Sequence, residues 1–236
     1  MPVLDPRNGS EIPSWSRSGR LLARPDAAPT RPNTPGTRPL GLGEGRDGLL
    51  VVPALAPANG LPLLVWLHGA GGKAGNVIGL LETQARAAGV ALLVPESRGV
   101  TWDIILGGYG PDVAFLDVAL HQVFAELPLD SKRVAIGGFS DGASYALSLG
   151  LANGDLFRWV LAFSPGVAIP PAKQGKPRIY ISHGTEDTVL PIARCSRRIV
   201  PRLLDAGYEV RYDEFEGGHM VPGKIATEAL ALLLES

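Results

Sequence analysis

From residue 49 onward, short apolar runs alternate with longer stretches of helical character. Several short runs are nearly continuous in Val, Leu and Ile, as expected of strands that helices cover on both faces. The alternation predicts an α/β fold, a mostly parallel twisted sheet with helices on both faces. Strands are expected at Leu49–Val52, Leu63–His68, Ala91–Pro95, Arg133–Phe139, Trp159–Phe163, Arg178–His183 and Glu209–Phe215. Helices are expected at about residues 76–88, 112–126, 141–152, 192–206 and 222–235.

Residues 1–47 lack this alternation. Eight prolines fall within the first 40 positions, beside many Arg, Gly and Asp residues. Such a composition predicts an irregular arm that drapes over the domain or stays mobile. We therefore divide the chain into a proline-rich N-terminal arm, 1–47, and a single folded domain, 48–236.

Composition narrows the functional classes. The 236 residues are 45% hydrophobic and 19% charged, and 22 basic against 23 acidic side chains give a net charge of −1. Because no long run of either sign occurs, neither nucleic acid nor an anionic membrane is expected as a partner. The single cysteine, Cys195, cannot form an internal disulfide, and the first residues carry an early acid without an apolar signal core. These features predict a cytoplasmic protein, either monomer or homodimer.

The segment Gly138–Gly142, Gly-Phe-Ser-Asp-Gly, lies between a predicted strand and a predicted helix. A serine on so tight a turn is forced into an unusual backbone conformation, and glycines on both sides let the neighbouring chain pass close by. The pattern is typical of a nucleophile elbow with Ser140 as the nucleophile. The alternative is a glycine-rich turn that carries an inert serine.

A second glycine-rich turn, His68–Gly72, follows the strand predicted to end at His68. The backbone N–H groups of Ala70 and Asp141 are candidates for a two-donor oxyanion hole. The alternative is a flexible strand-to-helix loop. A phosphate-binding loop is disfavoured because Lys73 is followed by alanine instead of serine or threonine.

Asp187 and His219 each lie in a loop shortly after a predicted strand. Asp187 is a candidate to orient a histidine, and its alternative role is that of a helix N-terminal acid. His219 follows two glycines near the end of the chain and is the best candidate base. His68 and His183 are expected to fix turns by hydrogen bonding, and His121 is expected on a helix surface. No histidine or cysteine spacing indicates a metal site.

The ligands of parallel α/β sheets bind at the carboxyl ends of the strands, where all these candidates fall. Their order along the chain, Ser140, Asp187, His219, is the nucleophile-acid-base order of the α/β-hydrolases. In such a constellation, the serine attacks an acyl carbonyl, the histidine takes its proton, and water resolves the acyl-enzyme.

Through these motifs the chain resembles the α/β-hydrolase superfamily over roughly residues 48–236. More narrowly, it is similar to bacterial serine esterases of the phospholipase/carboxylesterase group, which are similar to acyl-protein thioesterases and dienelactone-hydrolase-like proteins. The motifs are Leu-His-Gly-Ala-Gly-Gly at 67–72, Gly-Phe-Ser-Asp-Gly at 138–142, His-Gly-Thr-Glu-Asp-Thr-Val-Leu-Pro at 183–191 and Gly-Gly-His at 217–219. The resemblance implies a carboxylic-ester hydrolase that needs no cofactor. Asp141 stands where the thioesterases usually carry glutamine, and Ser140 stands where dienelactone hydrolases carry cysteine.

Substrate signals are weaker. Only residues 164–177 separate two predicted strands at the point where many lipases carry a large helical cap, so an open site without a cap domain is expected. Trp102, Ile105 and Tyr109 follow a strand end and are candidates to wall an apolar acyl pocket, with core packing as the alternative. We expect small esters with short to medium acyl chains as substrates. The alternatives are a peptidase or amidase, a thioesterase, or a non-catalytic ligand-binding protein of the same fold.

Overall fold

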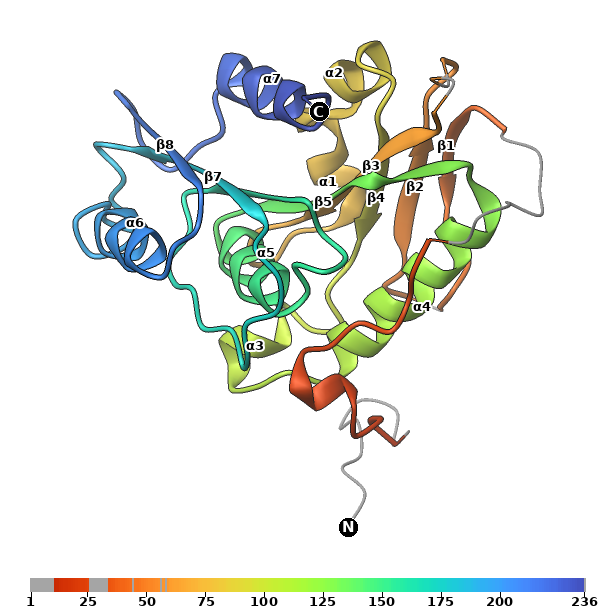
Figure 1. The fold of residues 1–236 in the computed structure, drawn as a ribbon, viewed down its shortest axis with the longest axis horizontal. Coiled ribbons are helices and arrows are strands. Elements are labelled where there is room, and N and C mark those ends of the chain that lie inside the picture. Colours follow the sequence, from red (N-terminus) through yellow and green to blue (C-terminus); the bar gives the residue numbers. More distant parts are fainter. Residues whose placement is uncertain (1–10, 26–33, 44, 56, 58, 236) are drawn as a thin grey trace.

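The computed structural model describes residues 11–25, 34–43, 45–55, 57 and 59–235. Its strands are β1 (Gly36–Pro39), β2 (Gly48–Val52), β3 (Leu61–Leu67), β4 (Ala91–Pro95), β5 (Leu129–Phe139), β6 (Trp159–Phe163), β7 (Arg178–Gly184) and β8 (Val210–Phe215). In the described part of the chain they form one eight-stranded sheet in the order β1-β2-β4-β3-β5-β6-β7-β8 (Figure 1). β1 and β2 are antiparallel to their neighbours, and the other six strands are parallel.

Helices cover both faces of this sheet. They are α1 (Ala74–Val77), α2 (Glu82–Ala87), α3 (Asp103–Leu106), α4 (Pro111–Glu126), α5 (Asp141–Ala152), α6 (Ser196–Asp205) and α7 (Gly223–Leu232), with short 3-10 turns at Ser16–Ser18 and Ile78–Leu80. α2 and α7 contact each other on one face, and α4, α5 and α6 supply buried side chains to the other (Figure 1).

Each face has its own hydrophobic cluster, and β3 shows why. Leu63, Val65 and Leu67 belong to the cluster beneath α4 and α5, whereas Leu64 and Trp66 belong to the cluster beneath α1, α2 and α7. Side chains of a strand point alternately to opposite faces, so a strand covered on both sides must be apolar at every position. The unbroken apolar runs in the sequence follow from this requirement, and the predicted α/β fold is confirmed.

Several element boundaries differ from expectation, two of them for a reason visible in the sequence. The helix predicted at 76–88 is broken into α1, a 3-10 turn and α2. Gly75 and Gly79 lie in this stretch, and glycine weakens a helix interior. β5 begins at Leu129, four residues before the expected start, because the charged residues at its beginning carry no apolar strand signal.

The prediction of an irregular arm is wrong for Gly36–Pro39, which form β1 and pair with Val52–Leu49 of β2. This edge strand is only half-buried at alternate positions and contains no large apolar side chain, so its sequence gives no strand pattern. Its proline is tolerated because an edge strand has one unpaired side.

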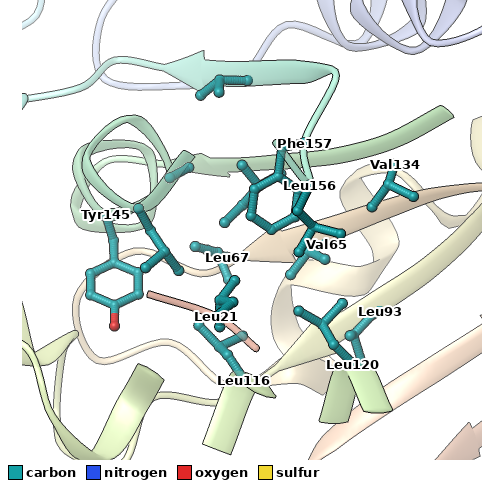
Figure 2. Packing of buried hydrophobic residues seen from close by; sticks show 14 of the residues in the cluster. Leu21, Val65, Leu67, Leu93, Leu116, Leu120, Val134, Tyr145, Leu156 and Phe157 are labelled. Atoms are coloured by element: carbon teal, nitrogen blue, oxygen red, sulfur yellow. The ribbon is translucent and has the colours of Figure 1, made fainter. Parts of the chain in front are cut away.

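Residues 19–23 of the expected arm are bound to the domain. Leu21 is buried in the cluster that contains Val65 and Leu67 (Figure 2). Its N–H donates to Oδ1 of Asn153 (2.9 Å), and the N–H of Ala23 donates to Oδ1 of Asp117 (2.8 Å). Leu21 and Ala23 of the arm are therefore packed into the domain core, while residues 1–10 and 26–33 lie outside the described residues.

The link between β6 and β7, residues 164–177, contains neither helix nor strand, which leaves the carboxyl end of the sheet without a cap at this point. Within the described residues, no helix combines the length and apolar character that crossing a bilayer requires.

Candidate active site

Ser140 stands at the junction of β5 and α5 with φ 58° and ψ −121°, a backbone conformation that is strained for a residue other than glycine. The flanking glycines make the turn possible. A Cβ at Gly142 would lie 2.3 Å from the carbonyl oxygen of Leu67, and one at Gly138 would lie 2.6 Å from the backbone of Gly142. The elbow expected from the sequence is thus present, with the serine half-buried at the carboxyl edge of the sheet.

The structure brings Ser140, Asp187 and His219 together from three separate loops. Nε2 of His219 lies 2.9 Å from Oγ of Ser140, and Nδ1 lies 2.6 Å from Oδ2 of Asp187. Because the carboxylate only accepts, Nδ1 carries the proton and Nε2 is free to accept the serine hydroxyl proton. The ring of Phe139 lies beside the imidazole, with ring centres 4.6 Å apart.

Asp187 is buried, and burial alone would favour its protonated form. The hydrogen bond to His219 and the backbone N–H groups of Leu190 (2.8 Å) and Val189 (2.9 Å) outweigh burial and hold the pKa of Asp187 below its usual value. One carboxylate oxygen faces the histidine while the other receives both N–H groups. This division fixes the carboxylate as an ionised partner for the imidazole.

The other histidines have the roles expected of them. His183 is buried, with Nδ1 2.7 Å from Oγ of Ser196 and Nε2 2.8 Å from the carbonyl oxygen of Leu190. Burial lowers its pKa, so it is uncharged beside Asp187, whose Oδ2 lies 3.2 Å away. His121 is exposed on α4.

His68 shapes the second glycine-rich turn. Its Nε2 accepts the N–H of Ser97 (2.9 Å), so Nδ1 carries the proton and donates to the carbonyl oxygen of Gly69 at 2.7 Å. Burial lowers the pKa of His68, and the ring stays neutral. The imidazole thereby orients the peptide group that precedes Ala70.

This turn lies directly against the nucleophile, since a Cβ at Gly69 would be 3.3 Å from Cβ of Ser140. Gly71 anchors it on the far side by donating its N–H to the carbonyl oxygen of Val100 (2.7 Å). Among the described residues, no acceptor bonds the N–H of Ala70 or of Asp141. Both donors predicted for the oxyanion hole are therefore available next to Ser140.

The predicted pocket wall needs a correction at Trp102. Its side chain is fully buried, stacks on Tyr145 and donates Nε1–H to the carbonyl oxygen of His68 (2.8 Å). It therefore supports the glycine-rich turn from beneath and cannot contact a ligand. Ile105 is 37% exposed and Tyr109 is half-buried, and their place in a substrate pocket stays a prediction.

Sequence reasoning missed two polar contacts near the elbow. The hydroxyl of Thr101 donates to Oδ2 of Asp141 at 2.7 Å. Beyond it, Asp103 and Asp112 exchange backbone-to-carboxylate hydrogen bonds, Asp103 N–H to Oδ2 of Asp112 (2.7 Å) and Asp112 N–H to Oδ2 of Asp103 (3.0 Å). These residues lie in a segment without apolar periodicity, so the sequence holds no signal that would have joined them.

Within the described chain, no three His, Cys, Asp or Glu side chains are grouped as metal ligands would be. The side chains gathered at the site are a serine hydroxyl, an imidazole and a carboxylate, joined by hydrogen bonds.

The sheet order, the elbow and the three loops define the α/β-hydrolase fold. Among solved structures, the S-formylglutathione hydrolase of Staphylococcus aureus has the same fold, with a TM-score of 0.67 and 15% identity over 86% of this chain and 99% of that one. Esterase PE8 has a TM-score of 0.62 and 25% identity, covering 78% of this chain and 98% of the other.

A model of the phospholipase/carboxylesterase family matches residues 114–231, half of the chain, and includes Ser140, Asp187 and His219. The chain belongs to this family. It is also 32% identical over 157 residues to feruloyl esterase C of Emericella nidulans, a match that covers 63% of this chain and 57% of that relative. The chain thus spans little more than half the length of this curated relative.

Proposed function

We propose that this protein is a serine hydrolase of carboxylic esters, with Ser140 as nucleophile, His219 as general base and Asp187 as the acid that orients the base. The continuous hydrogen-bond chain from Ser140 Oγ through His219 to Asp187, with distances of 2.9 and 2.6 Å, carries the proposal. Family membership and the strained elbow support it.

In the proposed reaction, His219 takes the hydroxyl proton as Ser140 attacks the ester carbonyl. The backbone N–H groups of Ala70 and Asp141 stabilise the negative charge that develops on the carbonyl oxygen. His219 then protonates the leaving alcohol, and a water molecule activated by the same histidine releases the acid. Asp187 stabilises the imidazolium in both steps and keeps Nε2 directed at the serine.

We propose small esters with short to medium acyl chains as substrates. The uncapped carboxyl edge of the sheet supports access of small molecules, and the feruloyl esterase relative adds aromatic acyl groups to the substrates to be tested. From the sequence we also propose a cytoplasmic location and a monomeric or homodimeric state.

The decisive experiment combines turnover with detection of the covalent intermediate. Wild-type protein is assayed with 4-nitrophenyl esters from acetate to decanoate and with methyl ferulate. Its intact mass is then measured after treatment with a fluorophosphonate probe. We expect ester turnover and one adduct on Ser140, both abolished in Ser140→Ala. Faster cleavage of aminoacyl amides or thioesters would reassign the substrate class, and absence of both adduct and turnover would indicate a non-catalytic binding protein.

A further inference from the structure

A cavity of about 320 Å³ lies between residues 166–170 and α6. Its apolar wall consists of Leu151, Val167, Ile169, Ile199 and Leu203. Val167 and Ile169 are 39% and 52% exposed, so they present apolar surface that a ligand in the cavity can cover. The volume is at the lower end of the range for small-molecule sites.

Hydrogen bonds connect this cavity to the nucleophile. The N–H of Gly166 donates to Oγ of Ser144 at 2.9 Å, one helical turn after Ser140. The side chain of Leu190 lies 3.4 Å from the position of a Cβ on Gly166, and the Leu190 N–H donates to Asp187. Gly166 thus lines the cavity and contacts Ser144 and Leu190, which are hydrogen-bonded to Ser140 and to Asp187 respectively.

Four basic side chains line the cavity, and no acidic side chain among the described residues does so. They are Lys173, Arg194, Arg198 and Arg202. The three arginines recur at every fourth position, which places them on one side of the α6 region. No carboxylate in the described chain pairs with any of the four. Arg197, which does not line the cavity, is paired with Glu214 at 2.7 Å.

We propose that this cationic cavity, defined by Lys173, Arg194, Arg198 and Arg202, binds a carboxylate carried by the ester substrate. The inference rests on the proposed esterase function and names its substrate class: esters with an apolar segment of a few carbons that ends in a negative charge. The apolar segment would lie on Val167 and Ile169, and the arginine guanidinium groups would receive the carboxylate, for which their planar donor geometry is suited.

Two matched pairs of esters test the proposal and show whether the carboxylate belongs to the acyl or the alcohol side of the substrate. On the acyl side, mono-4-nitrophenyl adipate is compared with 4-nitrophenyl hexanoate. On the alcohol side, 4-carboxyphenyl butyrate is compared with 4-carbamoylphenyl butyrate. The measured quantity is the ratio of kcat/KM for the charged ester to that for its neutral counterpart, in wild type, in R198A/R202A and in the matched control R197A.

We expect the ratio to fall about 2- to 30-fold in R198A/R202A for one of the two pairs, since each exposed ion pair contributes roughly 0.2–1 kcal/mol. Raising the ionic strength to 0.5 M should lower the wild-type ratio in the same direction. R197A should change the ratio by less than twofold. A ratio that is the same in wild type and R198A/R202A for both pairs overturns the proposal.

Failure of the proposed function would look different, because wild type would then cleave neither member of either pair and form no adduct on Ser140. Binding still tests the cavity in that event. Calorimetry on Ser140→Ala should show tighter binding of the charged ester of one pair, weakened by R198A/R202A. Equal affinity for charged and neutral esters would overturn the inference without reference to turnover.

Discussion

Thr101 holds the residue that follows Ser140: its hydroxyl donates a 2.7 Å hydrogen bond to the carboxylate of Asp141, and Thr101 is buried. The N–H of Asp141 is one of the two proposed oxyanion donors. A side-chain anchor on this residue restricts the peptide group that carries the donor, and oxyanion stabilisation depends on donors that are fixed before the reaction.

We therefore expect Thr101→Val to lower kcat about 3- to 10-fold with little change in KM, within the energy range of a typical hydrogen bond. Thr101→Ser keeps the hydroxyl and should restore most of the rate. Steady-state kinetics with a 4-nitrophenyl ester measures both variants. Equal rates for the valine and serine variants would exclude a role for this hydrogen bond.

Asp187→Asn tests the tautomer of His219. The asparagine oxygen can still accept the N–H groups of Val189 and Leu190, which turns its NH₂ group toward Nδ1 of His219. Nδ1 must then accept, so the proton moves to Nε2, which can no longer take the proton of Ser140. We expect kcat to fall about 10³- to 10⁴-fold while the fold is retained. Circular dichroism and ester turnover measure the two quantities, and a loss below tenfold would argue against Asp187 as the orienting acid.

Gly142 tests the close packing of the elbow. A Cβ at this position would lie 2.3 Å from the carbonyl oxygen of Leu67 and 2.5 Å from that of His68, and neither backbone atom can move freely. Gly142→Ala should lower the free energy of unfolding by about 3 kcal/mol or more, beyond ordinary overpacking. Gly79→Ala is the matched control, because nothing lies within 4 Å of its Cβ position. Urea unfolding compares the two, and similar midpoints would contradict the packing argument.

Asp103 links stability to pH. Burial, with the charge of Asp112 as the next cause, raises the pKa of Asp103 from its ordinary value of 3.8 to about 7. The folded protein therefore binds more protons than the unfolded chain between these values. The stability contributed by the protonated form is fully present below about pH 4 and is lost as pH rises toward 7.

Asp103→Asn keeps an acceptor oxygen for the N–H groups of Gly110 and Asp112 but cannot ionise. The melting temperature of this variant relative to wild type should therefore rise between pH 5 and pH 8. Differential scanning calorimetry at both pH values measures the difference. A difference that does not change with pH would show that the carboxyl of Asp103 titrates normally.

Much of the candidate site could be read from the sequence because its residues follow strands directly. Ser140, Asp187 and His219 come after β5, β7 and β8, and the carboxyl ends of parallel strands necessarily meet at one edge. The sequence therefore predicts their common location without any knowledge of side-chain positions. The position of Trp102 could not be predicted in this way, because its place beneath the glycine-rich turn depends on the path of an irregular loop.

The sequence by itself determined the α/β architecture and the placement of the three loops, because short apolar runs, helical stretches and glycine-flanked turns are local properties of the chain. Tertiary structure alone decided the pairing of β1 with β2, the burial of Trp102, the Asp103–Asp112 pair and the gathering of four cations around a cavity. Each of these depends on how irregular segments or the side chains of distant elements meet across the fold, and the sequence has no periodic signal for such contacts.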